Sequence, residues 1–307
     1  MKNTVDYYYN IRIDNLIKGS SDYYFFIGND EYHLIKYNRP LEDINSLYKL
    51  NIEMLKRNAL IHMIILNKDK QVITMINNEP YILIKLCKYK SEKVGAFEIS
   101  YFQNITYDIE FDKTLLRNDW VKLWSEKIDY YEYQINQFGK EYPILCDSLN
   151  YFIGLGENAI SYLVNNIENK SDVLVASHKR ININKGSFEF FNPLNLIVDN
   201  RVRDISEYIK ESYFLKKFNS NEIKSFLNQS DFSRKEYIYL FSRLLFPTYY
   251  FDKYDEIINN KISEDIIIPI LNKVNDYQQF LLSMYKYIVY EKKVQIEPIE
   301  WILKADY

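Results

Sequence analysis

The stretch that decides the fold is FEFFNPLNLIVDNRVRDISEYIKESYF, residues 188–214. It opens on FEFFN, whose aromatic content is typical of a strand, and Pro193 interrupts that pattern. Its end has the pattern of the first turns of a helix. Between the two elements stand four charged residues, which are Asp199, Arg201, Arg203 and Asp204.

The four charges allow two interpretations. In the functional one they form a site in which Asp199 is a metal ligand. In the structural one Asp204 is a helix N-cap and first-turn anion, and Arg201 and Arg203 pair with it and with Asp199. The structural interpretation is favoured, because a charged cluster can shape a loop without taking part in catalysis.

Composition limits the function classes. The chain has 307 residues, 47% of them apolar, and a formal net charge of -3. These values predict a soluble globular protein and leave no basic footprint for nucleic acid. The start, MKNTVDYYYN, lacks the apolar region of a signal peptide, and no apolar run approaches the roughly 20 residues of a membrane span. We therefore expect a cytoplasmic protein without a membrane span.

Residues with special chemistry are few. Cys87 and Cys146 stand far apart, so we expect ordinary thiols rather than a disulfide or a metal motif. His33, His62 and His178 are also scattered, and no pair of them has the spacing of a zinc site. The sequence therefore predicts no metal centre built from histidine and cysteine.

The first part of the chain reads as a small antiparallel sheet with one helix. Aromatic and β-branched strands are expected between residues 9 and 37, with a hairpin turn at Gly28. Apolar residues at helical spacing predict a helix over 41–57. Three more strands are expected between 62 and 86. The sheet ends near residue 88, which is the predicted domain boundary.

The remainder reads as helical. A helix is predicted over 115–138 with Gly139 as its C-terminal cap, and another over 148–167. Two strands interrupt the helices, one within 172–181 and the other at 188–192. Six further helical patterns follow; they lie at 204–214, 220–229, 235–246, 249–260, 264–274 and 277–293.

Three segments carry a family resemblance: DNRVRDISEYIK at 199–210, SRLLFPTYYFDKYDEII at 242–258 and PIEWILK at 298–304. Together with the order of elements, they resemble the kinase-like proteins associated with bacterial spore coats. That group is similar to the aminoglycoside and choline phosphotransferase branch of the protein-kinase-like fold. The resemblance implies an α+β, two-lobed fold. Residues 1–88 would form an N-terminal lobe with an antiparallel sheet and one helix, and 89–307 a larger, mostly helical C-terminal lobe.

An active member of that branch needs few chemical parts. A strand lysine holds the nucleotide phosphates, an Asp in a His-x-Asp loop is the base, and a second Asp carries Mg²⁺. About a dozen residues later, a further Asp opens a helix in an Asp-Leu-Ala-like motif. Asp204-Ile205-Ser206 resembles this last motif, and twelve places earlier stands Asn192 in place of the metal-binding Asp.

The catalytic loop also departs from the family pattern. If His178 is the family histidine, Lys179 takes the place of the base by its spacing to Asn184, with Arg180, two places after His178, as a close alternative. Neither cation accepts a proton while it is charged, and either would repel Mg²⁺. Asn184 stands five places after Lys179, as the family Asn would. The resemblance therefore implies degenerate catalytic positions and no expected catalytic residue.

Nucleotide binding has weaker support. Lys36 on a strand stands where a phosphate-holding lysine would lie, and Glu53 or Glu42 on the next helix would pair with it. Asp199 would then be a displaced ligand for Mg²⁺ of ATP. The alternative is that Lys36 is a solvated strand residue, which is common. Only the turn KGSSDYY, residues 18–24, offers a glycine-containing nucleotide loop.

Three hypotheses for function follow. The first is a pseudokinase that acts as a binding or assembly factor, with protein partners in the spore coat or envelope as the resemblance implies. Its expected location is the cytoplasm, and also the spore coat if it joins that layer. The second is an atypical small-molecule phosphotransferase that uses ATP and Mg²⁺. The third is nucleotide binding without chemistry.

Overall fold

The computed structural model describes residues 1–20, 22–138, 141–166 and 171–304. The chain forms two compact units, which are described separately below. The first unit comprises residues 1–116 and 173–201, and the second comprises 117–172 and 202–307. The lobe boundary predicted near residue 88 falls inside the first unit, between its sheet and helix α3 (Ala96–Thr106), and it remains a prediction.

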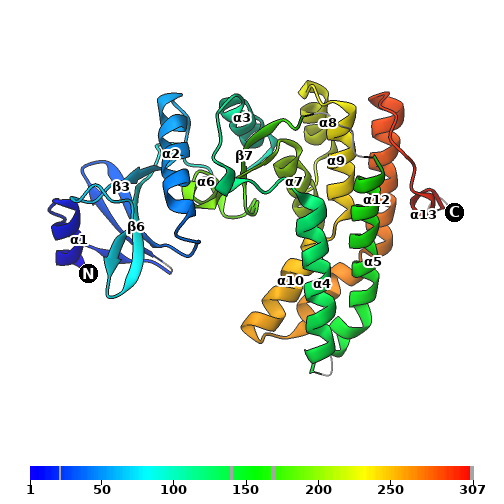
Figure 1. The fold of residues 1–307 in the computed structure, drawn as a ribbon, viewed down its shortest axis with the longest axis horizontal. Helices are drawn as coiled ribbons and strands as arrows, with labels where there is room; N and C mark the ends of the chain where they lie inside the picture. The colour runs from blue at the N-terminus through cyan, green and yellow to red at the C-terminus, as the bar shows by residue number, and fades with distance from the viewer. Residues whose placement is uncertain (21, 139–140, 167–170, 305–307) are drawn as a thin grey trace. The chain divides into compact units, whose positions relative to one another are not determined.

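The first unit contains the predicted antiparallel sheet (Figure 1). Its strands run in the order β1-β2-β3-β6-β4, and β5 also pairs with β6. The turn between β2 and β3 contains Gly28 with a φ of 58°, a conformation that favours glycine. The strands are β1 (Ile17–Lys18), β2 (Asp22–Ile27), β3 (Asp30–Lys36), β4 (Met63–Ile65), β5 (Thr74–Ile76) and β6 (Glu79–Lys85).

Two helices lie on opposite faces of this sheet, α1 (Lys2–Tyr9) and α2 (Asp43–Lys56) (Figure 1). The face toward α1 buries Phe25, Leu34 and Leu83 in a cluster with residues of α1. Helix α2 confirms the predicted amphipathic helix. Helix α1 was not predicted, and the strand prediction that began at residue 9 is wrong there, because Tyr9 is the last residue of α1.

The first unit also contains a two-stranded antiparallel sheet of β7 (Leu174–His178) and β8 (Leu196–Asn200). The prediction of a second strand at 188–192 is wrong. Those residues fall in α6 (Gly186–Phe190) and the turn after it, and the true strand is β8. Aromatic content misled the prediction, since Phe190 and Phe191 are buried by packing on other rings and not by strand pairing.

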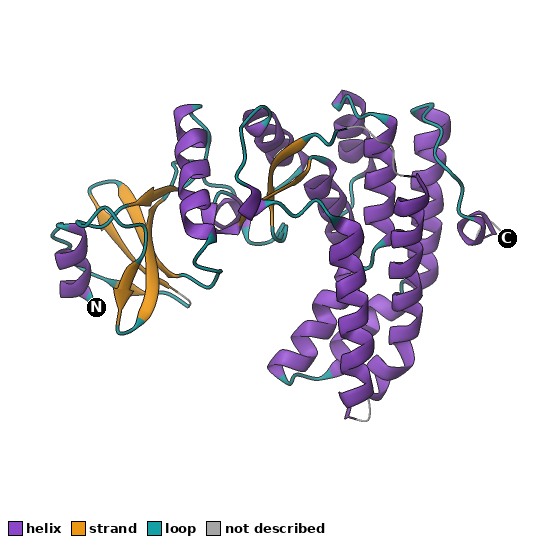
Figure 2. Cartoon of the chain, viewed as in Figure 1, coloured by secondary structure: helices purple, strands orange, loops and turns teal. Residues whose placement is uncertain are grey.

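The second unit is helical throughout its described part, as predicted for most of this region (Figure 2). Helix α4 confirms the predicted helix and buries Trp120, Trp124, Ile128 and Tyr131 along one stripe, whereas Leu123, which was expected on the same face, is exposed. The cap predicted at Gly139 lies outside the described residues. The elements are α4 (Trp120–Phe138), α5 (Pro143–Asn166), α7 (Val202–Phe214), α8 (Ser220–Gln229), α9 (Arg234–Leu245), α10 (Thr248–Asn260), η4 (Glu264–Ile267), α11 (Ile268–Leu271), α12 (Val274–Lys286), η5 (Tyr287–Glu291) and α13 (Glu300–Leu303).

A buried lysine joins three of these helices. The Lys210 ammonium of α7 donates to the carbonyl oxygens of Arg243 at 2.8 Å and Phe246 at 3.1 Å, at the C-terminal end of α9. It also donates to the hydroxyl of Thr248 on α10 at 2.7 Å. Glu207 lies 3.0 Å from the ammonium and accepts from Arg243 at 2.7 Å. Lys210 thereby satisfies carbonyl groups that a helix end leaves without partners.

Burial lowers the pKa of Lys210 to about 8, although Glu207 opposes the shift. For Glu207 burial raises the pKa, but the charges of Lys210, Arg243 and Arg203 outweigh it, so the net pKa is lowered. Both groups are therefore charged at neutral pH. A charged group that is 1% exposed is stable only while its partners are in place.

Replacing Lys210 with Met is expected to lower the free energy of unfolding of the second unit by about 3 kcal/mol or more, because Glu207 and the carbonyls lose their partner. The matched control is Lys224→Met, whose exposed pair with Glu291 is worth at most about 1 kcal/mol. Urea unfolding followed by tryptophan fluorescence measures the difference, since the second unit contains all three tryptophans. Equal effects of the two substitutions would contradict this account.

Candidate functional site

The first unit contains a pocket of about 630 Å³. One wall is strand β3, with Glu31 and His33. A second wall is the segment that follows β6, residues 86–92, here called the linker. The third wall is the connection between β7 and β8, residues 179–195, here called the β7–β8 connection. The lining residues are Glu31, His33, His62, Leu86, Cys87, Tyr89, Lys90, Ser91, Glu92, Lys185, Ser187 and Phe188.

The β7–β8 connection is hydrogen-bonded to the linker. The Ser187 backbone N–H donates to the Ser91 carbonyl oxygen at 2.8 Å, and the Ser91 N–H donates to Ser187 Oγ at 3.0 Å. These two bonds use the backbone donor and acceptor of Ser91. The backbone of the linker is therefore partly occupied by the protein's own chain beside the pocket.

His62 extends this contact. The Cys87 N–H donates to His62 Nδ1 at 3.1 Å, so Nε2 carries the hydrogen of the neutral ring and donates to the Phe188 carbonyl oxygen at 3.0 Å. The His62 backbone N–H donates to the Phe191 carbonyl at 3.0 Å. Burial lowers the pKa of His62 to about 4, although the bond to Phe188 opposes the shift. A neutral imidazole thus bridges the linker and the β7–β8 connection.

His33 lies between two acidic side chains at the pocket. Its Nδ1 lies 2.5 Å from Asp22 Oδ2, and its Nε2 lies 3.0 Å from Glu31 Oε1. Lys90 donates to the other oxygen of Glu31 at 2.9 Å. The Phe188 ring lies on His33, with centroids 4.8 Å apart. Burial raises the pKa of Glu31, but hydrogen bonds and charges from Lys90 and His33 give a net lowering.

Lys36 does not lie in this pocket. It stands opposite Tyr81 in the ladder, and Tyr81 belongs to the cluster on the α1 face. Side chains alternate along a strand, so the pocket residues Glu31 and His33 share one face and Lys36 lies on the other. Lys36 pairs with Glu79 at 2.5 Å, both side chains are half exposed, and this hydrogen bond raises the pKa of Lys36.

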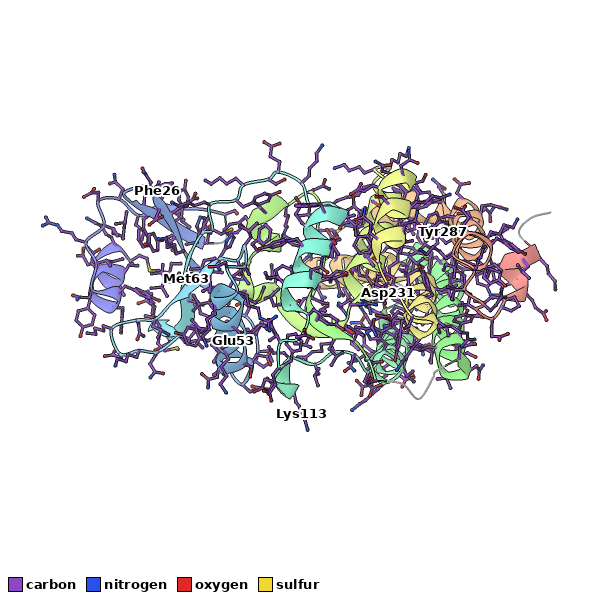
Figure 3. The ribbon with its side chains drawn as sticks, turned by 90° about the horizontal axis from the view of Figure 1, so that it is seen from above. Phe26, Glu53, Met63, Lys113, Asp231 and Tyr287 are labelled. Carbon is purple, nitrogen blue, oxygen red and sulfur yellow. The ribbon has the colours of Figure 1, made fainter. Side chains whose placement is uncertain are left out.

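Glu53 is likewise placed away from Lys36. It lies on α2 and pairs with Lys56 at 2.6 Å, and about half of its side chain is exposed (Figure 3). Among the ion pairs of the described residues, none joins Lys36 to Glu53 or to Glu42. Their assignment to a nucleotide site remains a prediction that this geometry does not support.

The positions that the family resemblance assigns to catalysis fall within or beside the β7–β8 connection. His178 is 2% exposed, stacks on Phe190 with centroids 4.2 Å apart, and its Nε2 lies 2.8 Å from the Phe190 carbonyl. Lys179 is exposed, and its N–H donates to Asn195. Asn192 accepts from the Leu194 N–H at 3.0 Å and caps the turn η3 (Pro193–Asn195). His178 and Asn192 thus have structural contacts.

The four charged residues of the deciding stretch lie where the chain passes from the first unit to the second. Asp199 is fully buried in β8, and its Oδ1 accepts from the Asn200 N–H at 2.7 Å. The Arg201 carbonyl accepts from Gln103. Asp204 is the third residue of α7, so it lies in the first turn as predicted and is not the N-cap. Pairing of the arginines with the aspartates remains a prediction.

The described residues contain no group of three or more His, Cys, Asp or Glu side chains suited to a metal ion. The lining cations of the pocket have carboxylate neighbours: Lys90 pairs with Glu31, and Lys185 lies 3.6 Å from Glu189. Phosphate would therefore compete with these carboxylates. No helix in the described part of the chain is long and apolar enough to cross a membrane.

Sequence reasoning missed His33, His62, Ser187 and Phe188 as site residues. The histidines are 29 positions apart in the sequence, and the fold brings both rings to Phe188. No short-range spacing signals this arrangement. The sequence offers one signal. The aromatic segment FEFFN lies between two strands, where a short hairpin turn would be enough to connect them.

The pH dependence of stability provides a test of the neutral His62 bridge. The unfolded chain binds a proton at His62 below about pH 6.5, whereas the folded protein does so only near pH 4. The contribution of neutral His62 to the free energy of unfolding is therefore complete above pH 6.5. It decreases by about 3 kcal/mol as the pH falls toward 4.

His62→Gln keeps a neutral donor and acceptor, so it is expected to remove most of this pH dependence while it largely retains stability at pH 7. Urea unfolding followed by circular dichroism at pH 7.5 and 4.5 gives the comparison. An unchanged pH dependence in the variant would contradict the assignment.

Comparison with known proteins identifies the family of the chain. The family model for the spore coat putative kinase YutH matches residues 2–284. The chain is 24% identical to the endospore coat-associated protein YutH of Bacillus subtilis (strain 168), with 99% of each chain covered. Among solved structures, it is similar to an aminoglycoside phosphotransferase from Alicyclobacillus acidocaldarius, with a TM-score of 0.66 and 10% identity over 91% of this chain and 94% of that one.

It is also similar to the choline kinase LicA from Streptococcus pneumoniae, with a TM-score of 0.54 and 14% identity over 92% of this chain and 97% of that one. At these identities the structural likeness shows the fold alone, which is the protein-kinase-like fold with a sheet-containing N-terminal part and a mostly helical C-terminal part. Because the family model covers most of the chain, the chain belongs to the YutH family of spore coat putative kinases.

Proposed function

We propose that this protein is a catalytically inactive member of the kinase-like fold that acts as a binding and assembly factor. The observation that carries the proposal is the contact between the β7–β8 connection and the linker. Ser187 takes up the backbone donor and acceptor of Ser91, and His62 takes up the N–H of Cys87. A ligand in the pocket would find these linker groups already bonded.

The identities of the motif positions support the same proposal. Where active relatives have a base and a metal ligand, the resemblance assigns Lys179 and Asn192 here. The side chain of Asn192 is used as a turn cap, and Lys36 lies on the other face of the sheet from the pocket. Phosphoryl transfer depends on groups that position the phosphates and the metal. Here the base and the metal ligand are replaced and the strand lysine lies elsewhere, so these groups are missing from the pocket.

The family and the curated relative suggest the setting. YutH of Bacillus subtilis is named as endospore coat-associated. On this basis the protein is proposed to be made in the cytoplasm and to bind protein partners of the spore coat. A soluble kinase-like chain without phosphotransfer would contribute surfaces for assembly, and the pocket would be one of them.

The decisive test is a melting-temperature titration with ATP, with and without Mg²⁺, together with a turnover assay. A nucleotide that binds only the folded state raises the melting temperature by mass action. The expected results are no rise at millimolar nucleotide and no turnover. Turnover that requires Mg²⁺ would overturn the proposal in favour of an atypical phosphotransferase, and a rise without turnover would favour nucleotide binding without chemistry.

Asp199 separates the structural role from a metal-binding role. Because it is buried and accepts from the Asn200 N–H, Asp199→Ala is expected to lower stability by about 1–3 kcal/mol. Asp199→Asn keeps an acceptor and is expected to cost less. If both variants instead kept their melting temperature and lost a Mg²⁺-dependent nucleotide effect, Asp199 would be a metal ligand.

A further inference from the structure

The first unit contains a second pocket, of about 750 Å³, here called the α2 pocket. One wall is a stripe along one face of α2, formed by Ser46, Lys49, Leu50, Glu53 and Arg57. The other wall is the segment 108–115, which follows α3 and ends in the turn η1 (Lys113–Leu115). The residues that line the α2 pocket differ from those that line the pocket described above.

Hydrogen bonds hold the two walls together at both ends. At one end, the Arg57 guanidinium donates to the carbonyl oxygens of Tyr107 at 2.8 Å and Asp108 at 3.2 Å. At the other end, Thr114 Oγ1 donates to Ser46 Oγ at 2.8 Å. Ser46 and Arg57 are about three turns apart along α2, a rise of about 16 Å. The α2 pocket therefore has the length of about five residues of an extended chain.

Between these ends, the second wall has backbone groups without protein partners. Within the described residues, Glu110 and Phe111 belong to no helix or strand, and neither takes part in a hydrogen bond. The next residue, Asp112, has extended dihedral angles, with a φ of −74° and a ψ of 138°. An extended stretch with free N–H and C=O groups is similar to the open edge of a sheet, to which another chain can add as a strand.

The wall formed by α2 adds a pattern of charge. Lys49 and Glu53 are one turn apart on this helix, about 6 Å along its axis (Figure 3 labels Glu53). Alternate side chains of an extended chain point in the same direction and are about 6.6 Å apart. An acidic and a basic residue at alternate positions of a bound strand would therefore reach Lys49 and Glu53 together.

These charges are open to a ligand. Among the ion pairs of the described residues, none includes Lys49 or Glu110, and the pair of Glu53 described above is exposed and contributes little. Hydrogen bonds from Thr114 lower the pKa of Asp112, and the charge of Lys49 adds to this shift, so an acidic ligand group would compete with Asp112 for Lys49.

Glu110 provides a second carboxylate near Glu53. Thr114 is bonded to the start of the α2 stripe, and Asp108 is bonded to its end. The segment thus runs in the opposite direction to α2, which places Glu110 near the level of Glu53. A basic residue at this level would meet a carboxylate on each wall.

We propose that the α2 pocket binds an extended segment of a protein partner, which pairs with the backbone of Glu110 and Phe111. The segment carries an acidic and a basic residue at alternate positions. The acidic residue binds Lys49, and the basic residue lies between Glu53 and Glu110. Charge complementarity favours this occupant over an apolar or singly charged segment, because the α2 wall has both signs one turn apart. The proposal does not depend on whether the protein transfers phosphate or binds nucleotide.

The test selects binders from a displayed library of short random peptides, with the full-length protein as target. Glu110→Lys is compared with Asp14→Lys, because Asp14 is an exposed acidic residue of the first unit that does not line the α2 pocket. The selected peptides are expected to carry opposite charges at alternate positions. By fluorescence polarisation, they are expected to bind Glu110→Lys about tenfold more weakly than the wild type or Asp14→Lys.

A second variant keeps the test decisive if Glu110→Lys lowers the melting temperature. Lys49→Glu is expected to weaken the same peptides and to select peptides with two basic residues instead. The proposal fails if no selected peptide distinguishes the wild type from these variants, or if the peptides share no pair of opposite charges. Wild-type dimers that Glu110→Lys dissociates, measured by analytical ultracentrifugation, would also overturn it, because a second copy of the chain would then occupy the pocket.

Hydrogen exchange locates the bound peptide. The amide hydrogens of Glu110 and Phe111 are expected to exchange rapidly in the free protein. With a saturating selected peptide, at least one of the two is expected to exchange about tenfold or more slowly, because it becomes a strand donor. Unchanged exchange at both positions would show that the peptide does not pair with this segment, and the proposal would be wrong.

Discussion

The neutral imidazole of His62 is the interaction on which the arrangement of the first unit's pocket depends. A single ring accepts a hydrogen bond from the linker and donates one to the β7–β8 connection. A protonated ring has no acceptor, and the other neutral tautomer would present its donor to the Cys87 N–H. One protonation state and one tautomer thus satisfy both neighbours. Burial, by disfavouring the charged form, selects that state.

In the second unit, a charged side chain satisfies buried polar groups. At the end of α9, carbonyl oxygens turn inward and accept from the ammonium of Lys210, whose charge is balanced by Glu207. This arrangement holds three helices together, but it depends on every member of the cluster. The contact between the linker and the β7–β8 connection, in contrast, is made by neutral bonds from Ser187 and His62. These two contacts therefore differ in the kind of polar group that they bury.

The sequence predicted the elements whose burial follows a regular period. The stripe of α4 is such a case, because each residue's neighbours lie within a turn. Strands β2 and β3 were predicted instead from their aromatic and β-branched content and from the turn at Gly28. It failed at α1 and at FEFFN, where aromatic residues are buried by contacts with distant segments. The same distinction applies to the site. Asp204 in its first turn follows from local pattern, whereas His33 and His62 meet Phe188 only through the sheet and the connection.

The position of Lys36 has a consequence for any route back to phosphate chemistry. Strand β3 presents its odd-numbered residues to the pocket, as Glu31 and His33 show, and an even-numbered residue stays on the other face while the register with β6 holds. A lysine of β3 could reach phosphate in the pocket only from an odd-numbered position. The alternative is a shift of the strand register by one residue, which would turn Leu34 out of the core. For the catalytically inactive protein proposed above, the geometry of the strand is thus the first limit on phosphoryl transfer, before the replacement of the acids is considered.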